Sequence, residues 1–162
     1  MKHINTEKNI NRKVKLSKII SQSNTFLIQN INHKRQLFTK ISKIIEADIK
    51  FSYKNVLDFF LDKEKVENSS IGSGVALPNI KLSNIDESIG IFIKLNKSIN
   101  YNSIDNEPVD LIFTLISPKI DSSVHLNELA YISRLLTQKK TLQNIRGSLD
   151  IETIYAILTN EI

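Results

Sequence analysis

Residues 109–116 read Val-Asp-Leu-Ile-Phe-Thr-Leu-Ile, and residues 88–95 read Ser-Ile-Gly-Ile-Phe-Ile-Lys-Leu. Both stretches are dense in β-branched and aromatic residues, which favour strands whose two faces are buried. Between them, residues 105–108 (Asp-Asn-Glu-Pro) have a composition typical of a turn. The two stretches therefore predict core strands of a β-sheet.

Helical periodicity appears on both sides of these strands. Apolar stripes at helical spacing predict helices over residues 34–47, 53–65 and 124–137, a short helix over 141–146 and a last helix after Asp150. The expected N-caps are Asn32, Ser52, Ser122 or Ser123, and Asp150, because their side-chain oxygens can accept free backbone N–H groups. Residues 25–28 and 71–77 add two further expected strands. The order β, α, α, β, β, β, α, α predicts a single α/β domain, a mixed sheet flanked by helices.

Composition excludes several classes of protein. A length of 162 residues suits one domain, and 41% hydrophobic with 24% charged residues is ordinary for a globular chain. The absence of Cys excludes disulfides, thiolate metal sites and a Cys nucleophile. The longest strongly apolar run, residues 111–116, is far shorter than the roughly 20 residues of a membrane-spanning helix. We expect a cytoplasmic protein that does not insert into membranes.

The basic excess is confined to one end of the chain. The formal net charge is +5, of which residues 1–50 contribute +8 and residues 51–162 contribute −3. Residues 1–13 show no apolar period and are expected to form a disordered basic tail ahead of a domain at 14–162. The helix over 53–65 carries Asp58, Asp62 and Glu64, which a DNA-recognition helix would not present to phosphates. Nucleic-acid binding is therefore not expected.

Familiar catalytic motifs are missing. The sequence holds no G-x-S-x-G elbow, and residues 72–74 (Gly-Ser-Gly) lack the Lys and the spacing of a phosphate-binding loop. Three scattered His residues (His3, His33, His125) do not make a metal site, and no cofactor is expected. His125 falls in the first turn of the helix over 124–137, where the free N–H groups can favour an anion. It is either part of an anion or phosphoryl site or a polar first-turn residue without a role.

Four blocks in order carry a family resemblance: residues 62–66 (Asp-Lys-Glu-Lys-Val) followed by 70–79 (Ser-Ile-Gly-Ser-Gly-Val-Ala-Leu-Pro-Asn), 104–113 (Ile-Asp-Asn-Glu-Pro-Val-Asp-Leu-Ile-Phe), 125–129 (His-Leu-Asn-Glu-Leu) and 132–136 (Ile-Ser-Arg-Leu-Leu). They resemble the phosphotransferase-system enzyme IIA proteins of the fructose/mannitol type, whose signature reads E-R-E-x-L-x-x-T-G-I-G-x-G-[IV]-A-[IL]-P-H. The nitrogen-regulatory branch is the most similar. The resemblance covers about residues 14–160.

The resemblance also identifies a missing group. In the family, the His after Ala-[Ile/Leu]-Pro accepts a phosphoryl group from the phosphocarrier protein HPr, and here that position is Asn79. An amide nitrogen has its lone pair delocalised into the carbonyl, so it cannot act as the nucleophile. Lys63 matches the family's assisting Arg and keeps the charge without the planar fork. His125 matches the family's second His.

Two hypotheses follow from this pattern. In the first, the protein is a regulatory module that binds HPr or regulatory target proteins and is no longer phosphorylated at the usual site. In the second, it remains a phosphocarrier in a phosphoenolpyruvate-dependent relay and uses His125 as the acceptor. The second must displace the reacting geometry, which is costly in rate. Whether the chain is an enzyme stays open at this point.

Overall fold

The computed structural model describes residues 14–119 and 122–160. Within them, a six-stranded mixed sheet has the order β1-β5-β6-β3-β2, and β4 also pairs with β6. The strands are β1 (Thr25–Ile28), β2 (Ser70–Gly72), β3 (Val75–Ala76), β4 (Asn79–Leu82), β5 (Ile89–Ile99) and β6 (Val109–Pro118). Two short 3-10 helices, η1 (Leu16–Lys18) and η2 (Gln22–Asn24), precede β1. The predicted α/β class with a mixed sheet is confirmed.

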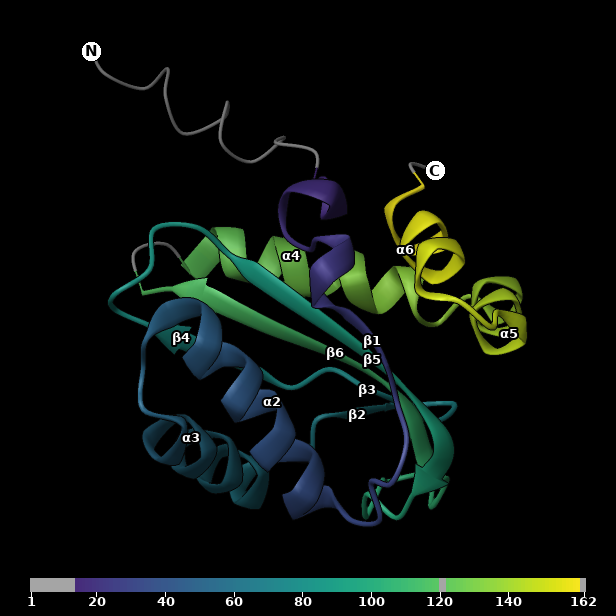
Figure 1. Ribbon diagram of the computed structural model, residues 1–162, viewed down its shortest axis with the longest axis horizontal. Helices are drawn as coiled ribbons and strands as arrows, with labels where there is room; N and C mark the ends of the chain where they lie inside the picture. Colours follow the sequence, from purple (N-terminus) through teal and green to yellow (C-terminus); the bar gives the residue numbers. More distant parts are fainter. Residues whose placement is uncertain (1–13, 120–121, 161–162) are drawn as a thin grey trace.

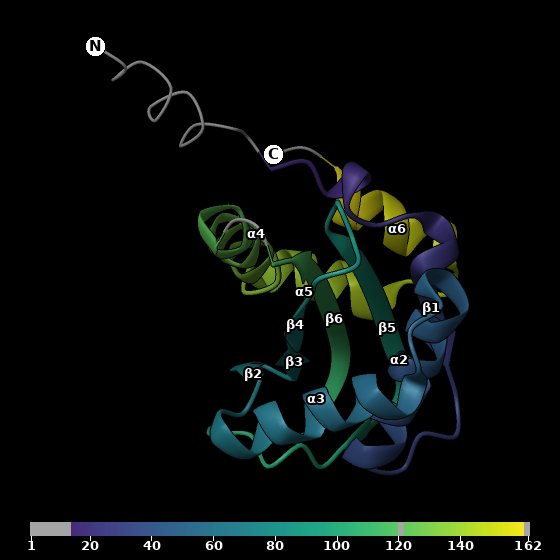
Figure 2. The same ribbon diagram turned by 90° about the vertical axis from the view of Figure 1, so that its left-hand side faces the viewer.

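Helices cover both faces of the sheet. The α-helices are α2 (Lys34–Ile49), α3 (Tyr53–Val66), α4 (Ser122–Leu135), α5 (Lys139–Gly147) and α6 (Ile151–Thr159). Figure 2 shows α2 and α3 on one side of β5 and β6, with α4, α5 and α6 on the other. Two apolar clusters, one between the sheet and α2–α3 and one between the sheet and α4–α6, form the core.

The two stretches that predict core strands do form its centre. β5 and β6 are antiparallel neighbours, with Phe92 opposite Phe113 (Figure 1). Along β6 the side chains alternate: Ile112 and Ile116 enter the cluster under α2 and α3, while Phe113 and Leu115 enter the cluster under α4 to α6. This alternation of a pleated strand sets which face each residue of β6 serves.

The stretch over 71–77 is not a single strand. Ser70–Gly72 and Val75–Ala76 pair as a short antiparallel hairpin around a tight turn. β3 then runs parallel to β6, with Val75 opposite Leu111, and β4 resumes with Asn79 opposite Leu115. The offset between partners is the same on both strands, so β3 and β4 form one line along β6 that is interrupted at residues 77–78. Residues 79–82 (Asn-Ile-Lys-Leu) were not predicted as a strand, because alternation over four residues is too short a signal.

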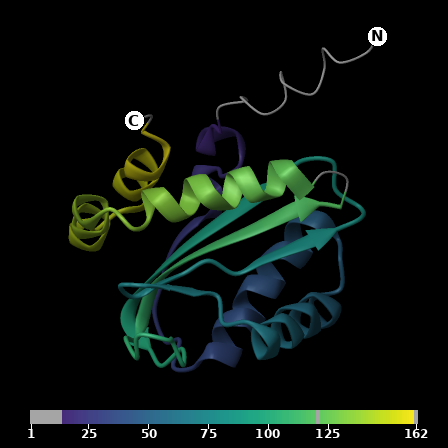
Figure 3. The same ribbon diagram turned by 180° about the vertical axis from the view of Figure 1, so that it is seen from behind.

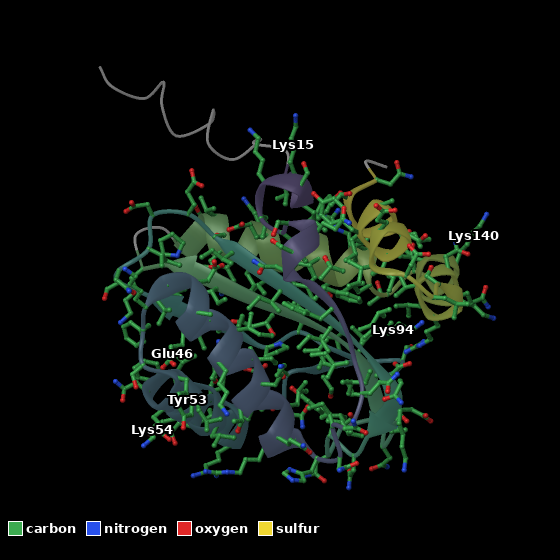
Figure 4. The ribbon with its side chains drawn as sticks, in the orientation of Figure 1. Lys15, Glu46, Tyr53, Lys54, Lys94 and Lys140 are labelled. Carbon is green, nitrogen blue, oxygen red and sulfur yellow. The ribbon has the colours of Figure 1, made fainter. Side chains whose placement is uncertain are left out.

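The helix caps are partly as expected. Asp150 caps α6 by accepting a hydrogen bond from Thr153 N at 2.8 Å, as predicted. The cap of α2 is His33, whose Nδ1 accepts from Gln36 N at 3.2 Å, so the prediction of Asn32 is wrong by one residue. At the start of α3 the Ser52 side chain makes no cap bond. Glu46 of α2 instead accepts from Tyr53 N at 2.7 Å, which joins the two helices at their corner (Figure 4).

The expected basic tail, residues 1–13, lies outside the described residues. So does the residue before Ser122, where the cap of α4 would be. Figure 3 shows α4 lying along the sheet, with its first turn near the end of β6. Among the described residues, no helix combines the length and apolar character needed to cross a membrane.

Candidate functional site

Asn79 is the first residue of β4 and follows the interruption between β3 and β4. At that interruption the Pro78 carbonyl accepts a hydrogen bond from Leu115 N at 3.0 Å, and Leu77 N donates to Ser69 O at 2.8 Å. Pro78 itself has no N–H to give to a ladder, so it fits the gap between the strands. The backbone around Asn79 is therefore held by the central strand β6.

Hydrogen bonds to Lys63 and to the Leu77 carbonyl fix the orientation of the Asn79 amide. Lys63 Nζ of α3 lies 2.6 Å from Asn79 Oδ1 and 2.6 Å from the Asn79 carbonyl oxygen. Asn79 Nδ2 donates to the Leu77 carbonyl at 3.1 Å. An ammonium group only donates and a carbonyl only accepts, so both neighbours demand the same amide orientation. The oxygen of Asn79 therefore faces Lys63 and His125.

His125 approaches Asn79 from α4 on the opposite side. The side chain is only 6% exposed, and its Nε2 lies 3.3 Å from Asn79 Oδ1. Its Nδ1 lies 2.6 Å from Ser117 Oγ at the end of β6. Lys63, Asn79 and His125, the three residues singled out in the sequence, are thus brought together from three elements.

The electrostatics of the site favour a neutral imidazole. Burial, followed by the positive charges of Lys81 and Lys63, lowers the pKa of His125 to about 4. Because Asn79 Oδ1 only accepts hydrogen bonds, the neutral ring must carry its hydrogen on Nε2. The lone pair is then on Nδ1, where the Ser117 hydroxyl donates to it.

Lys63 lies at the exposed edge of this arrangement. Burial is the largest cause that lowers the pKa of Lys63, and the charge of Lys81 acts in the same direction. The nearby carboxylates of Glu67 and Glu64 raise that pKa and partly offset the decrease. No signal in the sequence pointed to Lys81, which stands two residues after Asn79 on the same strand. Its positive charge lowers the pKa of both Lys63 and His125.

Two pockets lie beside this group of residues. One, of about 510 Å³, is lined by Lys63, Asn79 and residues of α4 including Leu126. The other, of about 730 Å³, is lined by Ser117, His125 and Glu128 among others. Leu126 is 64% exposed and Val124 is 47% exposed, so apolar side chains flank His125 on the surface. This rim offers a contact area for another macromolecule.

The Gly72–Gly74 turn lies at the start of the β3–β4 line. Gly72 and Gly74 have φ values of +94° and +78°, which side chains other than Gly rarely adopt. Arg146 of α5 holds the turn: its Nη2 donates to the Ser73 carbonyl at 2.6 Å and to Asp110 Oδ1 at 2.8 Å. These contacts are a reason for the two glycines that is independent of any reaction.

Neither Asn79 nor His125 has a ring or amide nitrogen that is free to attack a substrate. Asn79 has no nucleophilic nitrogen, and both ring nitrogens of His125 are in hydrogen bonds. The Lys63 ammonium has three N–H donors, and it lies at the exposed edge of the site beside an apolar rim. Among the described residues no group of three or more His, Asp or Glu side chains could hold a metal ion.

Comparison with known proteins places the chain in a family. The model of the family "Phosphoenolpyruvate-dependent sugar phosphotransferase system, EIIA 2" matches residues 18–161. A nitrogen regulatory protein of Bradyrhizobium diazoefficiens is 32% identical over 79% of this chain and 84% of its own length. That of Escherichia coli K12 is 28% identical over 91% of each chain.

Solved structures agree with these relatives. The nitrogen regulatory protein IIA-Ntr of Neisseria meningitidis superposes with a TM-score of 0.83 at 25% identity, over 89% of this chain and 99% of its own. The mannitol IIA of Escherichia coli has a TM-score of 0.71 at 12% identity, over 85% and 97% of the two chains. The second likeness supports the fold alone.

Proposed function

This chain belongs to the EIIA 2 family of the phosphoenolpyruvate-dependent sugar phosphotransferase system, and from that premise we propose that it is a regulatory protein-binding module no longer phosphorylated at the family's usual position. Asn79 stands at the position of the accepting His, with Lys63 as the neighbouring charge and His125 as the supporting imidazole. The protein would act in the cytoplasm, by contact with other proteins of the phosphotransferase system and with regulatory targets.

One observation carries this proposal. The Asn79 amide is bonded to Lys63, to the Leu77 carbonyl and to His125, all within 3.3 Å. Its oxygen accepts from the two neighbouring donors, and its nitrogen lone pair is delocalised into the carbonyl, so the amide has no nitrogen that can attack phosphorus. The surrounding donors and the exposed Leu126 still form a surface that a partner can contact.

The hypothesis that His125 is the acceptor has less support. To attack phosphorus through Nε2, the ring would first have to move its hydrogen to Nδ1, against the acceptor oxygen of Asn79. To attack through Nδ1, it would have to part from Ser117, which is 1% exposed. Either route starts from a ring that is not aligned with an incoming donor.

Phosphoryl transfer tests the proposal directly. Purified wild type, Asn79→His and His125→Ala are mixed with labelled phosphoenolpyruvate, enzyme I and HPr. We expect no label on the wild type and label on Asn79→His. In that variant a ring nitrogen of residue 79 forms a bond to phosphorus, the bond from phosphorus to the HPr imidazole breaks, and that imidazole takes up a proton from solvent.

Label on the wild type would contradict the proposal. If that label is lost in His125→Ala, the phosphocarrier hypothesis is correct instead. If neither the wild type nor Asn79→His is labelled, Lys63 and His125 do not form a phosphoryl-acceptor site around residue 79. The proposal that Asn79 replaces the accepting His of an otherwise intact site then fails.

Docking is tested separately by titrating the protein with unphosphorylated HPr. Leu126→Asp places a charge on the rim beside His125 and should weaken binding about tenfold or more, which corresponds to about 1.4 kcal/mol. Leu149→Asp is the matched control, because Leu149 is 89% exposed and lies between α5 and α6, outside both pockets beside the site. Equal affinities of the two variants would place docking elsewhere.

A further inference from the structure

We propose that Ser117 is a positioning residue: it holds the His125 ring so that Nε2–H points at residue 79 and the lone pair on Nδ1 stays hidden. The inference rests on the proposed function and deepens it, because it states how the second His of the site is kept a hydrogen-bond donor rather than a phosphoryl acceptor. Nothing in the Ser117 sequence context, a polar residue at the end of an apolar strand, suggested this role.

The position of Ser117 follows from the pleat of β6. Phe113 and Leu115 face the cluster under α4 to α6, so the next residue of the same parity, Ser117, faces α4 as well. In the ladder Ser117 is opposite Lys81, the third residue of β4. A hydroxyl therefore replaces an apolar group at the point where the strand passes below the first turn of α4.

The hydrogen bonds of the ring form a directed chain. Asn79 Oδ1 accepts, so Nε2 donates, so Nδ1 accepts, so the Ser117 hydroxyl donates. The contact of 2.6 Å to Ser117 is shorter than the contact of 3.3 Å to Asn79, which makes Ser117 the closer anchor of the ring. Without it, Nδ1 of a ring whose residue is only 6% exposed would lose the donor that satisfies it.

The residues of the site line two different pockets. Ser117 and His125 line the pocket of about 730 Å³, whereas Asn79 and Lys63 line the pocket of about 510 Å³. A partner that contacts Asn79 from the side of Lys63 therefore meets the Nε2 side of the ring. The Nδ1 side points into the body of the domain, at the end of β6.

A nucleophilic role for Ser117 fits the same contact less well. A hydroxyl that donates to a neutral His resembles the first two members of a serine nucleophile system. Here the hydroxyl is on a side chain that is 1% exposed, and a ring whose pKa lies at about 4 is a weak base. The pair is thus suited to hold the ring and not to attack a substrate.

The test is nuclear magnetic resonance of the ring nitrogens in protein labelled with ¹⁵N-histidine. Only three His residues contribute signals, and His125→Gln assigns the one from position 125. In the wild type we expect the Nε2–H form throughout the neutral range, with a titration near pH 4. In Ser117→Ala the ring should gain water and exchange between forms, and its pKa should rise towards the ordinary 6.5.

Two further variants separate positioning from general loosening. Ser117→Thr keeps a hydroxyl and should restore the wild-type spectrum. Ser88→Ala removes another hydroxyl that holds α4, through a 2.7 Å bond to Glu128 one turn after His125, and should leave the spectrum of His125 unchanged. In the Asn79→His background, Ser117→Ala should slow labelling by about tenfold to a hundredfold, and Ser117→Thr should recover most of the rate.

An unchanged His125 spectrum in Ser117→Ala would overturn the inference, as would an Nδ1–H form in the wild type. Equal changes in Ser117→Ala and Ser88→Ala would reduce Ser117 to a general anchor of α4 and overturn it too. The spectra need no phosphoryl transfer, so they decide the role of Ser117 whichever way the labelling of the wild type turns out. If Ser117→Ala does not fold, the wild-type tautomer and Ser117→Thr still decide.

Discussion

The Gly72–Gly74 turn and the Asn79 site stand five residues apart along one interrupted strand, yet they are built differently. In the turn, Arg146 binds the Ser73 carbonyl and the Asp110 side chain, and Asp105 accepts from Ser73 N. At Asn79, the Lys63 and His125 side chains from α3 and α4 converge on one amide oxygen, and all three residues line pockets.

The difference distinguishes residues that the fold requires, the two glycines of the turn, from residues that it does not require. Both glycines have positive φ, and a Cβ on Gly74 would lie 2.6 Å from Arg146 Nη2. The turn would therefore be kept in a protein with no function at this edge. Lys63 and His125 hold no strained backbone turn of this kind in place. Their convergence on Asn79 therefore supports a functional site more strongly than the two glycines do. Four predictions follow from this contrast.

The largest effect is expected at the turn. Gly74→Ala should lower the free energy of unfolding by about 3 to 4 kcal/mol, since the new Cβ both strains the backbone and displaces Arg146. Urea denaturation measures it. Gly147→Ala is the control, because no atom lies within 4 Å of its added Cβ, and it should change stability by no more than about 1 kcal/mol. Similar losses of stability in the two variants would contradict the claim that the fold requires Gly at position 74.

The next effect is a pH dependence at the site. The pKa of His125 is 6.5 in the unfolded chain and about 4 in the folded one. Between these values the unfolded state binds more protons, so stability is complete above pH 6.5 and is lost as the pH falls towards 4. The loss should be roughly 2 to 3 kcal/mol.

Glu128 acts in the opposite direction, because burial raises its pKa and its contribution falls as the pH rises. The measurement is therefore the difference between wild type and His125→Gln in denaturation curves over pH 4 to 8. His125→Gln should lose less stability on acidification than the wild type. Parallel curves would mean that His125 is already hydrated in the folded protein.

A smaller effect is expected from the ion pair that holds the turn. Asp110→Asn keeps the shape of the side chain and removes the charge facing Arg146, with which it shares contacts of 2.8 to 3.3 Å. The loss should be about 1 to 2 kcal/mol by thermal or urea unfolding. Asp62→Asn is matched to it: its partner Lys65 is 4.0 Å away and both are over 75% exposed, so about 0.5 kcal/mol or less is expected.

The smallest effect on stability is expected at Lys63. Lys63→Ala removes an exposed side chain and should change the free energy of unfolding by no more than about 0.5 kcal/mol. The same variant should weaken binding of HPr by about threefold to tenfold, because it removes a charge at the mouth of the pocket. A large loss of stability with unchanged binding would assign Lys63 to the fold and reverse the contrast with the turn.

Sequence patterns predicted much of this architecture. The two apolar stretches are β5 and β6, the amphipathic stripes are the helices on both faces, and Asp150 is the cap of α6. The patterns did not predict β4, or the hairpin inside residues 71–77, because short strands carry few residues of alternation and the turn hides it. The cap of α2 was missed by one residue, since Asn32 and His33 can both accept from the first turn.

The sequence by itself determined the chemistry that residue 79 lacks, because the absence of a nucleophilic nitrogen is a property of the Asn side chain alone. It also determined where the apolar faces lie, because hydrophobic periodicity is local along the chain. Only the tertiary structure decided that Lys63 and His125, 16 and 46 residues away, bond to the same amide. Only the register of β4 on β6 and the packing of α4 brought Ser117 to the His125 ring. Hydrogen-bond partners depend on that register, and so does the tautomer of His125.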